Sequence, residues 1–412
     1  MTISSDTTRR QIIATLGGLS FSTGCLSFTD SSDTSQTAIE RTSPNSSSST
    51  ASVQTTDTKS PTQTAQSSTP AVEITEHWTY QQDVTSFTTQ QDLDEGLIVC
   101  SPETAFVRLK KSDGSVQWRQ SISGSGSTDQ NISTRGAVSG SQVIVGGGTH
   151  LYALDINTGE VNWATEIPAQ EPLHNTTTEI VTSDNVAICG YSYSLENGED
   201  FAGLAGLNVE SGEIKWNKTH DEIASTYDSW LGIQSLLPPI GDRVIVAGWN
   251  QAFWVNISTG KVGNTALADA RYEFQLSDDT LYSTDAGKLY KWTIGSGGLT
   301  EEWMFEPLGR TTSAPAIGDD TAYVPADDTG IYAVSEGNQQ WRFQADSTVQ
   351  TQPAVGETGV WVAEDSLYWI TKSSGQGVMK ALDQIPYALS TTGNRCFLTG
   401  TDGTVCFQVR DL

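Results

Sequence analysis

The stretch 153–163 reads ALDINTGEVNW, and it is the clearest copy of a phrase that recurs along the chain. Two further copies follow it closely, RLKKSDGSVQW at 108–118 and GLNVESGEIKW at 206–216. Looser copies end at Trp303 and Trp341. Self-similarity at a regular spacing is typical of repeat architectures, so the repeat decides the fold.

A second pattern precedes each copy of the phrase. The segment 142–146 is an alternating apolar strand, a turn follows, and 151–154 is a second strand that runs into the phrase. A strand of small residues such as 313–317 comes earlier still. Each unit therefore has four short strands, A to D. The Thr-Gly-Glu segment is predicted to form the C–D turn, where the glycine supplies a positive φ.

The last residue of each copy of the phrase marks one unit, so these residues give the number of units. The eight marks are Trp78, Trp118, Trp163, Trp216, Asn264, Trp303, Trp341 and Met379. Residues 74–412 thus give about 42 residues per unit, which matches a four-stranded propeller blade. We predict an all-β fold, an eight-bladed β-propeller of four-stranded antiparallel blades.

The two ends of the repeat region supply an independent test of this count. The last unit has strands at 387–390, 395–398 and 405–409, and the sequence given then stops without a D strand. The first mark, Trp78, lies in a D strand that has no A, B or C strand before it. We therefore expect 74–81 to pair with 404–409, so that an N-terminal strand closes the ring without an open edge.

The recurring tryptophan brings a large apolar area to the position where neighbouring blades meet. Its indole N–H can donate to a backbone carbonyl, and its burial contributes a few kcal/mol by area, about 2–3. Asn264 and Met379 stand in place of this residue. We expect weaker blade interfaces at these two positions.

Residues 1–24 are predicted to be an export signal. Arg9 and Arg10 directly precede the short apolar run 12–19, which resembles a twin-arginine signal. Small residues then lead to Cys25, which resembles a lipoprotein cleavage site whose cysteine takes a diacylglycerol. A family site would have Leu three residues earlier, where Ser22 stands. Lipidation of Cys25 is expected, and simple cleavage or an uncleaved anchor is the alternative.

Residues 25–73 are predicted to be a disordered tether. Ser, Thr, Gln and Asp dominate this stretch, which cannot bury enough apolar area to offset the entropy lost on ordering. Such a tether has a typical reach of about 35–40 Å. It would hold the propeller clear of a membrane.

The charge balance excludes some partners. The chain has 22 Lys and Arg against 49 Asp and Glu, a net charge of −27. Nucleic-acid backbones and anionic lipid surfaces are poor partners for such a field. The imbalance comes chiefly from missing lysine, which fits a halophilic protein in screening salt. An acidic secreted protein in dilute medium has a similar composition.

The phrase resembles the repeat of the pyrroloquinoline-quinone-like β-propeller family over nearly all of 74–412, and 153–163 is a full match. That family includes quinoprotein dehydrogenases and cofactor-free scaffold lipoproteins, such as the eight-bladed member of the outer-membrane assembly machinery. The resemblance implies the fold and leaves two classes of function open, a scaffold and a membrane-tethered quinoprotein oxidoreductase.

The residues expected of a quinoprotein dehydrogenase are not recognisable in the sequence. A quinoprotein dehydrogenase of this family would show adjacent cysteines, a Ca²⁺ site, an Asp base and long insertions. The cysteines after Cys25 are far apart, and they are predicted to be buried free thiols: Cys100, Cys189, Cys396 and Cys406. The acidic pairs are predicted to be solvated turn carboxylates rather than Ca²⁺ ligands: Asp278-Asp279, Asp319-Asp320 and Asp327-Asp328. None of the four histidines has the spacing of a zinc site. No cofactor and no metal is therefore expected.

A binding face is predicted where the repeat spacing stretches to its longest interval. The B–C loop 191–201 and the connection 220–232 are both long, and they emerge on the same face of the ring. The candidate binding residues are Tyr191, Tyr193, Phe201, Tyr227, Trp230 and Trp249. Exposed aromatic residues on loops suit a protein or glycan partner. The alternative is that these loops are tolerated insertions whose aromatic residues pack among themselves.

The expectation from sequence is a non-catalytic propeller lipoprotein that is exported and anchored to the membrane at the cell surface. Its partner would be a protein or glycan of the cell envelope, and no nucleic acid is expected.

Overall fold

The computed structural model describes only part of the chain. Its backbone contacts divide the chain into two compact units, Met1–Ser68 and Thr69–Leu412. Arg9, Arg10, Cys25 and most of the predicted tether lie outside the described residues. The described residues belong to the second unit and are 71–81, 90–101, 105–122, 136–147, 149–167, 176–183, 185–194, 200–224, 233–248, 251–268, 273–277, 280–285, 287–295 and 298–411.

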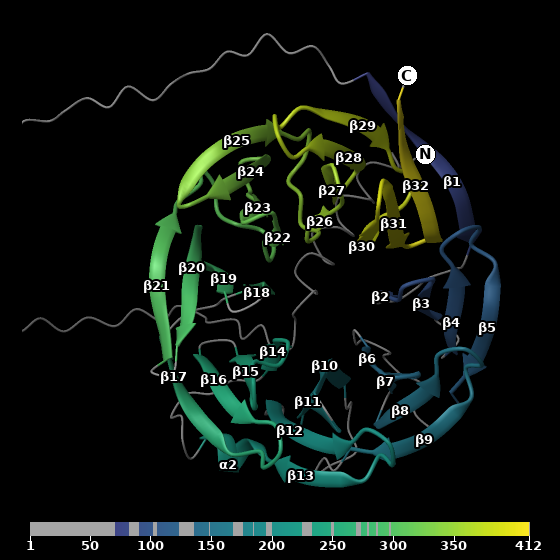
Figure 1. The fold of residues 1–412 in the computed structure, drawn as a ribbon, viewed down its shortest axis with the longest axis vertical. Coiled ribbons are helices and arrows are strands. Elements are labelled where there is room, and N and C mark those ends of the chain that lie inside the picture. Colours follow the sequence, from purple (N-terminus) through teal and green to yellow (C-terminus); the bar gives the residue numbers. More distant parts are fainter. Residues whose placement is uncertain are drawn as a thin grey trace, which may run out of the picture. The chain divides into compact units, whose positions relative to one another are not determined.

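The second unit consists of eight four-stranded antiparallel sheets arranged around a ring (Figure 1). Seven sheets follow the chain order A, B, C, D, and the eighth combines β30, β31 and β32 with β1. This confirms the predicted all-β, eight-bladed propeller. No helix in the described stretches is long and apolar enough to cross a membrane.

The first four blades span Gln90 to Ala268. Their strands are β2 (Gln90–Asp92), β3 (Gly96–Ser101), β4 (Ala105–Lys110) and β5 (Val116–Ser121); β6 (Ala137–Ser139), β7 (Gln142–Gly147), β8 (His150–Asp155) and β9 (Val161–Glu166); β10 (Thr176–Ser183), β11 (Val186–Ser194), β12 (Asp200–Asn208) and β13 (Ile214–Lys218); and β14 (Ile233–Leu236), β15 (Arg243–Gly248), β16 (Gln251–Asn256) and β17 (Val262–Ala268). The short helix α2 (His220–Ala224) follows β13.

The remaining blades complete the ring. Their strands are β18 (Glu273–Ser277), β19 (Thr280–Asp285), β20 (Lys288–Gly295) and β21 (Gly298–Phe305); β22 (Ala316–Gly318), β23 (Thr321–Pro325), β24 (Gly330–Ser335) and β25 (Asn338–Gln344); β26 (Ala354–Val355), β27 (Gly359–Ala363), β28 (Ser366–Thr371) and β29 (Gly377–Ala381); and β30 (Pro386–Thr392), β31 (Arg395–Gly400), β32 (Gly403–Asp411) and β1 (Val72–Gln81).

The strand β1 closes the ring as the D strand of the eighth blade. It pairs antiparallel with β32, with Ile74 opposite Val409 and Gln81 opposite Gly403. Trp78 lies opposite Cys406. The predicted pairing of 74–81 with the C-terminal strand is confirmed, and every sheet is complete.

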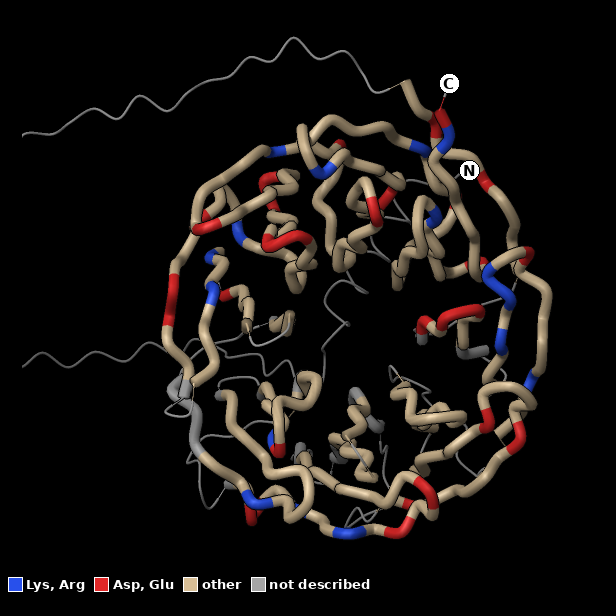
Figure 2. Tube along the Cα trace, in the orientation of Figure 1, with Lys and Arg blue, Asp and Glu red and all other residues tan. Residues whose placement is uncertain are grey.

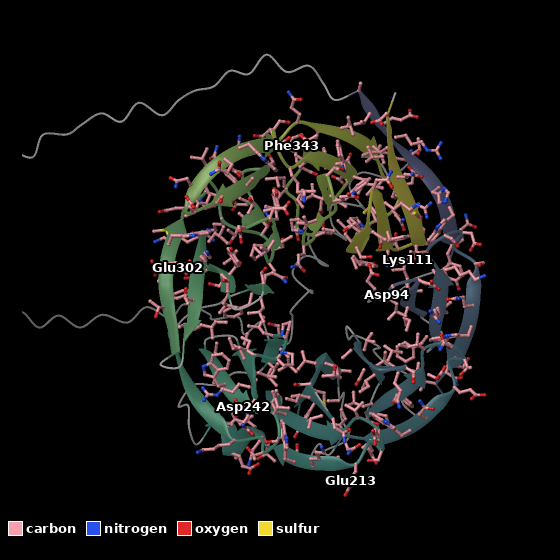
Figure 3. The ribbon with its side chains drawn as sticks, in the orientation of Figure 1. Asp94, Lys111, Glu213, Asp242, Glu302 and Phe343 are labelled. Atoms are coloured by element: carbon pink, nitrogen blue, oxygen red, sulfur yellow. The ribbon has the colours of Figure 1, made fainter. Side chains whose placement is uncertain are left out.

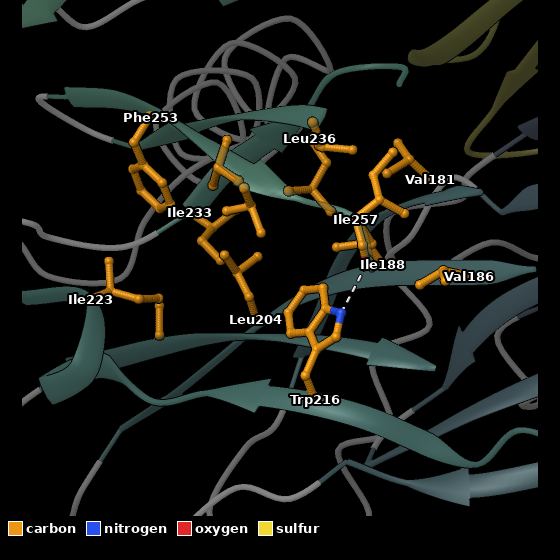
Figure 4. Packing of buried hydrophobic residues seen from close by; sticks show 14 residues of the cluster. Val181, Val186, Ile188, Leu204, Trp216, Ile223, Ile233, Leu236, Phe253 and Ile257 are labelled. Carbon is orange, nitrogen blue, oxygen red and sulfur yellow. Dashed lines mark hydrogen bonds between the residues drawn. The ribbon is translucent and has the colours of Figure 1, made fainter. Parts of the chain in front are cut away.

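Each D-strand tryptophan contacts the blade that follows it. Trp216 packs in a cluster that joins the third and fourth blades, and its indole N–H donates to the Ile257 carbonyl of the next C–D turn at 2.8 Å (Figure 4). Four others donate to the equivalent next turn at 2.7–3.0 Å: Trp78, Trp118, Trp163 and Trp341. The predicted role of the indole is confirmed. The cores therefore lie between blades.

The phrase glycine meets the tryptophan of the preceding blade. Gly159 has a φ of +75°, and a Cβ built there would lie 2.6 Å from Cδ2 of Trp118. Asp155 shapes the same turn, because its Oδ1 accepts the backbone N–H groups of Asn157 at 2.8 Å and Thr158 at 2.9 Å. The predicted positive φ is confirmed, and the glycine is also required by the close approach of the ring.

The two marks without tryptophan precede the fifth and the eighth blades. Asn264 precedes the fifth blade, whose C and D strands pair as far as Gly295 and Gly298 and whose sequence lacks the Thr-Gly-Glu turn of the clearest copy. Met379 precedes the eighth blade, whose C and D strands come from opposite ends of the unit. Neither blade therefore has the Thr-Gly-Glu turn of the clearest copy next to these two positions.

A buried lysine joins the closing blade to the first blade (Figure 3). The Lys111 ammonium pairs with Asp92, donates to Oγ1 of Thr392 at 2.9 Å, and lies 5.7 Å from the centroid of the Phe397 ring. Thr392 and Phe397 belong to the eighth blade, so this contact spans the junction that β1 completes.

The described cysteines are free thiols buried in strands: Cys189, Cys396 and Cys406. Cys396 lies opposite Phe407, and Cys406 lies opposite Phe397, so these two side chains point to opposite faces of the sheet. Gly400 pairs with Gly403, which places the turn at Thr401-Asp402. The side chain of Cys100 lies outside the described set.

Candidate binding surface

One face of the ring carries the B–C turns of the blades and the D–A connections between blades, because consecutive strands run antiparallel. We call it the B–C face. The A–B and C–D turns lie on the opposite face.

The predicted binding residues of the third blade have a different local structure from the one expected. Residues 191–194 of β11 pair with residues 200–203 of β12, and Tyr193 lies opposite Phe201. Tyr191 is only 1% exposed, and its hydroxyl donates to Asn217 at 2.8 Å. The prediction that Tyr191 is an exposed loop residue is wrong, because the strand continues through it and its ring fills the core.

The other predicted binding residues remain predictions. The side chains of Tyr193 and Phe201 lie outside the described set, as do Tyr227, Trp230 and Trp249.

The B–C face also carries an exposed leucine that the sequence did not single out. Leu308, in the connection between β21 and β22, is 84% exposed, the largest value among the large hydrophobic side chains described. Its neighbour Pro307 is buried. Binding residues lie disproportionately on the connections of a rigid scaffold, which is where Leu308 stands.

Backbone hydrogen bonds fix the connection that carries this leucine. The Arg310 N–H donates to Oδ1 of Asp327 at 2.8 Å, and the Asp327 N–H donates to the Arg310 carbonyl at 2.8 Å. The Thr312 N–H donates to the Pro325 carbonyl at 3.1 Å. The connection is thus tied to the B–C turn of the sixth blade.

A partly buried polar cluster supports the leucine itself. The Leu308 N–H donates to the Tyr332 hydroxyl at 3.2 Å, and that hydroxyl donates to Asp328. Arg342 donates from Nε to the same hydroxyl at 3.0 Å and from Nη2 to Oδ2 of Asp328 at 3.0 Å. The cluster is thus tied to the backbone of Leu308 by one hydrogen bond.

The ionisation of this cluster follows from its contacts. Burial raises the pKa of Tyr332, and the hydrogen bond to Asp328 raises it further. Burial alone would raise the pKa of Asp328, but hydrogen bonds from Tyr332, the Gly330 N–H and Arg342 hold it below its usual value. Asp328 is therefore an ion-paired carboxylate, and its prediction as a solvated turn residue is wrong. Asp327 is exposed as expected, and Asp278-Asp279 lie outside the described residues.

A second carboxyl group on this face, that of Glu364, has a raised pKa. Glu364 lies in the B–C turn of the seventh blade, where its Oε2 accepts the Gln350 N–H at 3.2 Å. Burial raises the pKa of Glu364 to about 7, and the nearby Asp365 adds to the rise. The connection between β25 and β26, which contains Gln350, also bonds to Asp327 through Thr348.

Acidic groups dominate the B–C face of the last three blades. The connecting segments there are 306–315, 326–329, 345–353, 364–365, 382–385 and 401–402, and Arg310 is the one basic residue within them. Their exposed carboxylates are Glu306, Asp327, Asp346, Asp365, Asp383 and Asp402. Figure 2 shows where Asp and Glu (red) and Lys and Arg (blue) lie along the trace around the ring.

A quinone and calcium site does not fit the described residues. No three His, Cys, Asp or Glu side chains gather there to hold a metal ion. The three described cysteines lie in separate strands and are buried, so they offer no adjacent pair. We derive no redox step for this chain.

The eight complete blades and the phrase that links each blade to the next define an eight-bladed β-propeller of the pyrroloquinoline-quinone-like type. The chain belongs to the family described as outer membrane protein assembly factor BamB, whose model matches residues 71–236, 107–275 and 264–384. No curated protein matches the chain.

Solved structures share this fold at low sequence identity. BamB from Moraxella catarrhalis has a TM-score of 0.59 at 18% identity, over 81% of this chain and 97% of that one. The computationally designed Ika8 protein has a TM-score of 0.61 at 13% identity, over 81% and 99%. Quinohemoprotein alcohol dehydrogenase ADHIIG from Pseudomonas putida HK5 has a TM-score of 0.59 at 11% identity, over 82% and 76%. At these identities the likeness concerns the fold alone.

Proposed function

We propose that the chain is a non-catalytic scaffold lipoprotein that is exported, anchored at the cell surface through Cys25, and binds a protein of the cell envelope with its B–C face. The description of its family as an outer-membrane assembly factor supports an envelope partner. The paired arginines and the Ser/Thr-rich tether support export and anchoring.

The observation that carries the binding role is Leu308, which is exposed on a connection held by hydrogen bonds at both its base and its flank. A contact residue fixed before binding loses little conformational entropy when a partner docks. Tyr193, Phe201, Tyr227, Trp230 and Trp249 are proposed to extend the same face over the third and fourth blades.

Site-specific photo-crosslinking of the full chain in its own cells tests the face. A benzophenone side chain at Asp402 reports on the B–C face, and one at Ser373, in an exposed C–D turn, reports on the opposite face. We expect an adduct with an envelope protein from position 402 and none from position 373. Adducts from position 373 alone would contradict the proposed face.

The enzymatic alternative has its own test. Purified protein is titrated with pyrroloquinoline quinone and Ca²⁺, and absorbance and dye reduction are followed. We expect neither a bound chromophore nor turnover. A stoichiometric chromophore with dye reduction would establish the oxidoreductase and overturn the scaffold.

A further inference from the structure

We infer that Leu308 docks into an apolar pocket with a basic rim on a partner protein, so that the partner's contact segment is rich in Lys and Arg. This inference rests on the proposed function and names the chemistry of the partner.

The leucine argues for a protein and for insertion into a pocket. An aliphatic side chain offers neither the flat ring that stacks on a sugar nor a hydrogen bond to one, so Leu308 does not suit a glycan. It stands exposed on the surface, with its own N–H held by Tyr332 at 3.2 Å. A partner that buries it gains apolar area and meets a side chain whose backbone is already fixed.

The surrounding charge argues for a basic rim. Glu306 lies two residues before Leu308, and Asp327 is hydrogen-bonded to the same connection. Asp346 and Asp365 continue the exposed carboxylates along this face. The connecting segments of the last three blades contain one basic residue, Arg310, beside these carboxylates. Complementary charge around an apolar centre raises specificity and the rate of association.

The same charges argue against a second copy of this chain as the occupant. The net charge of −27 makes two copies repel each other, most strongly at low salt. The occupant that fits is therefore a different protein with cationic side chains around a hydrophobic pocket.

The test measures the yield of one crosslink in two kinds of variant. A benzophenone side chain replaces the exposed Gln350, which lies on the connection that contacts Asp327 through Thr348. The full chain is irradiated in its own cells, the adduct yield is measured, and the crosslinked partner peptide is sequenced by mass spectrometry. Thermal unfolding of each purified variant checks that the ring is intact.

The first variant is Leu308→Asp, with Met379→Asp as its control, because Met379 is exposed on the outer strand β29. The second is the triple variant Glu306→Gln, Asp346→Asn and Asp365→Asn. Its control neutralises three exposed carboxylates of the opposite face, Glu160→Gln, Glu210→Gln and Glu357→Gln.

We expect Leu308→Asp to lower the adduct yield at least about tenfold, in line with the loss of one buried leucine. We expect the triple variant on the B–C face to lower it several-fold, both controls to leave it unchanged, and the partner peptide to have more Lys and Arg than Asp and Glu.

Three results would overturn the inference and leave the proposed function standing. These are an adduct that persists in Leu308→Asp, a yield that is unchanged or raised by the triple variant, and a partner peptide that is acidic or comes from this chain. If neither position 350 nor position 402 yields an adduct, the proposed function fails together with the inference.

Discussion

Replacement of Gly159 by alanine tests the contact that links one blade to the next. A Cβ at this position would lie 2.6 Å from Cδ2 and 2.8 Å from Cε3 of Trp118, below the distance that carbon atoms tolerate. The φ of +75° adds strain of about 1–2 kcal/mol for an L residue. The ring would have to move, which weakens the bond from Trp118 to the Ile156 carbonyl at 2.7 Å. Overpacking of this kind costs about 1–3 kcal/mol.

Gly140→Ala is the matched control in the same blade. Its φ is +58°, and nothing lies within 4 Å of the added Cβ. We expect Gly140→Ala to lower the free energy of unfolding by about 1 kcal/mol, since only backbone strain contributes. We expect about 3 kcal/mol for Gly159→Ala. Urea unfolding midpoints of the purified full chain measure the difference.

A double variant isolates the ring as the cause. In a Trp118→Leu background the clash is relieved, so Gly159→Ala should lose most of its excess cost over Gly140→Ala. Equal midpoints for Gly159→Ala and Gly140→Ala in the wild-type background would refute the reasoning.

Three further predictions concern buried polar groups. Lys111→Met should lower the free energy of unfolding by about 2 kcal/mol, because it removes the ammonium that pairs with Asp92 and donates to Thr392, whereas Lys110→Met, at an exposed position, should leave the urea midpoint unchanged. The raised pKa of Glu364, about 7, means that wild-type stability falls as pH rises from about 4.5 to 7. Glu364→Gln removes this pH dependence, so at pH 8 the free energy of unfolding of the variant, measured with urea, should exceed that of the wild type by up to about 3 kcal/mol. Equal stability of the two proteins at pH 8 would contradict this prediction. Burial raises the pKa of Cys189 and Cys406 to about 12, and it also raises the pKa of Cys396 well above its usual value. No thiol among these three should therefore react with an aromatic disulfide reagent until urea unfolds the ring.

The fold could be predicted because its signal lies within single units of sequence. The phrase at 153–163 contains the turn residues and the interface tryptophan, and the eight marks all fall in D strands. The closing pair of β1 and β32 followed from an incomplete unit at each end. The partner of each tryptophan lies in the next unit, which is why the absence of tryptophan at 264 and 379 had no evident cause in the sequence.

The surface could not be predicted to the same degree. Tyr191 and its neighbours looked like a loop, but β11 continues to Ser194 and β12 begins at Asp200. Leu308 carries no local signal, since its exposure depends on contacts between the fifth and sixth blades. Asp328 looked like any turn carboxylate, and its partner Arg342 is brought beside it only by the pairing of β24 with β25.

Closure of the ring by β1 is the claim on which the blade count and the B–C face depend. Glu73 and Arg410 lie opposite each other in this pairing, and both are exposed. Directly opposed strand residues have a Cα separation of about 4.5–5.5 Å, which a disulfide can span. In the double variant Glu73→Cys, Arg410→Cys, oxidation followed by peptide mapping should recover a peptide that links residues 73 and 410 within one chain. Two free thiols, or links to other cysteines, would show that β1 does not complete the eighth blade.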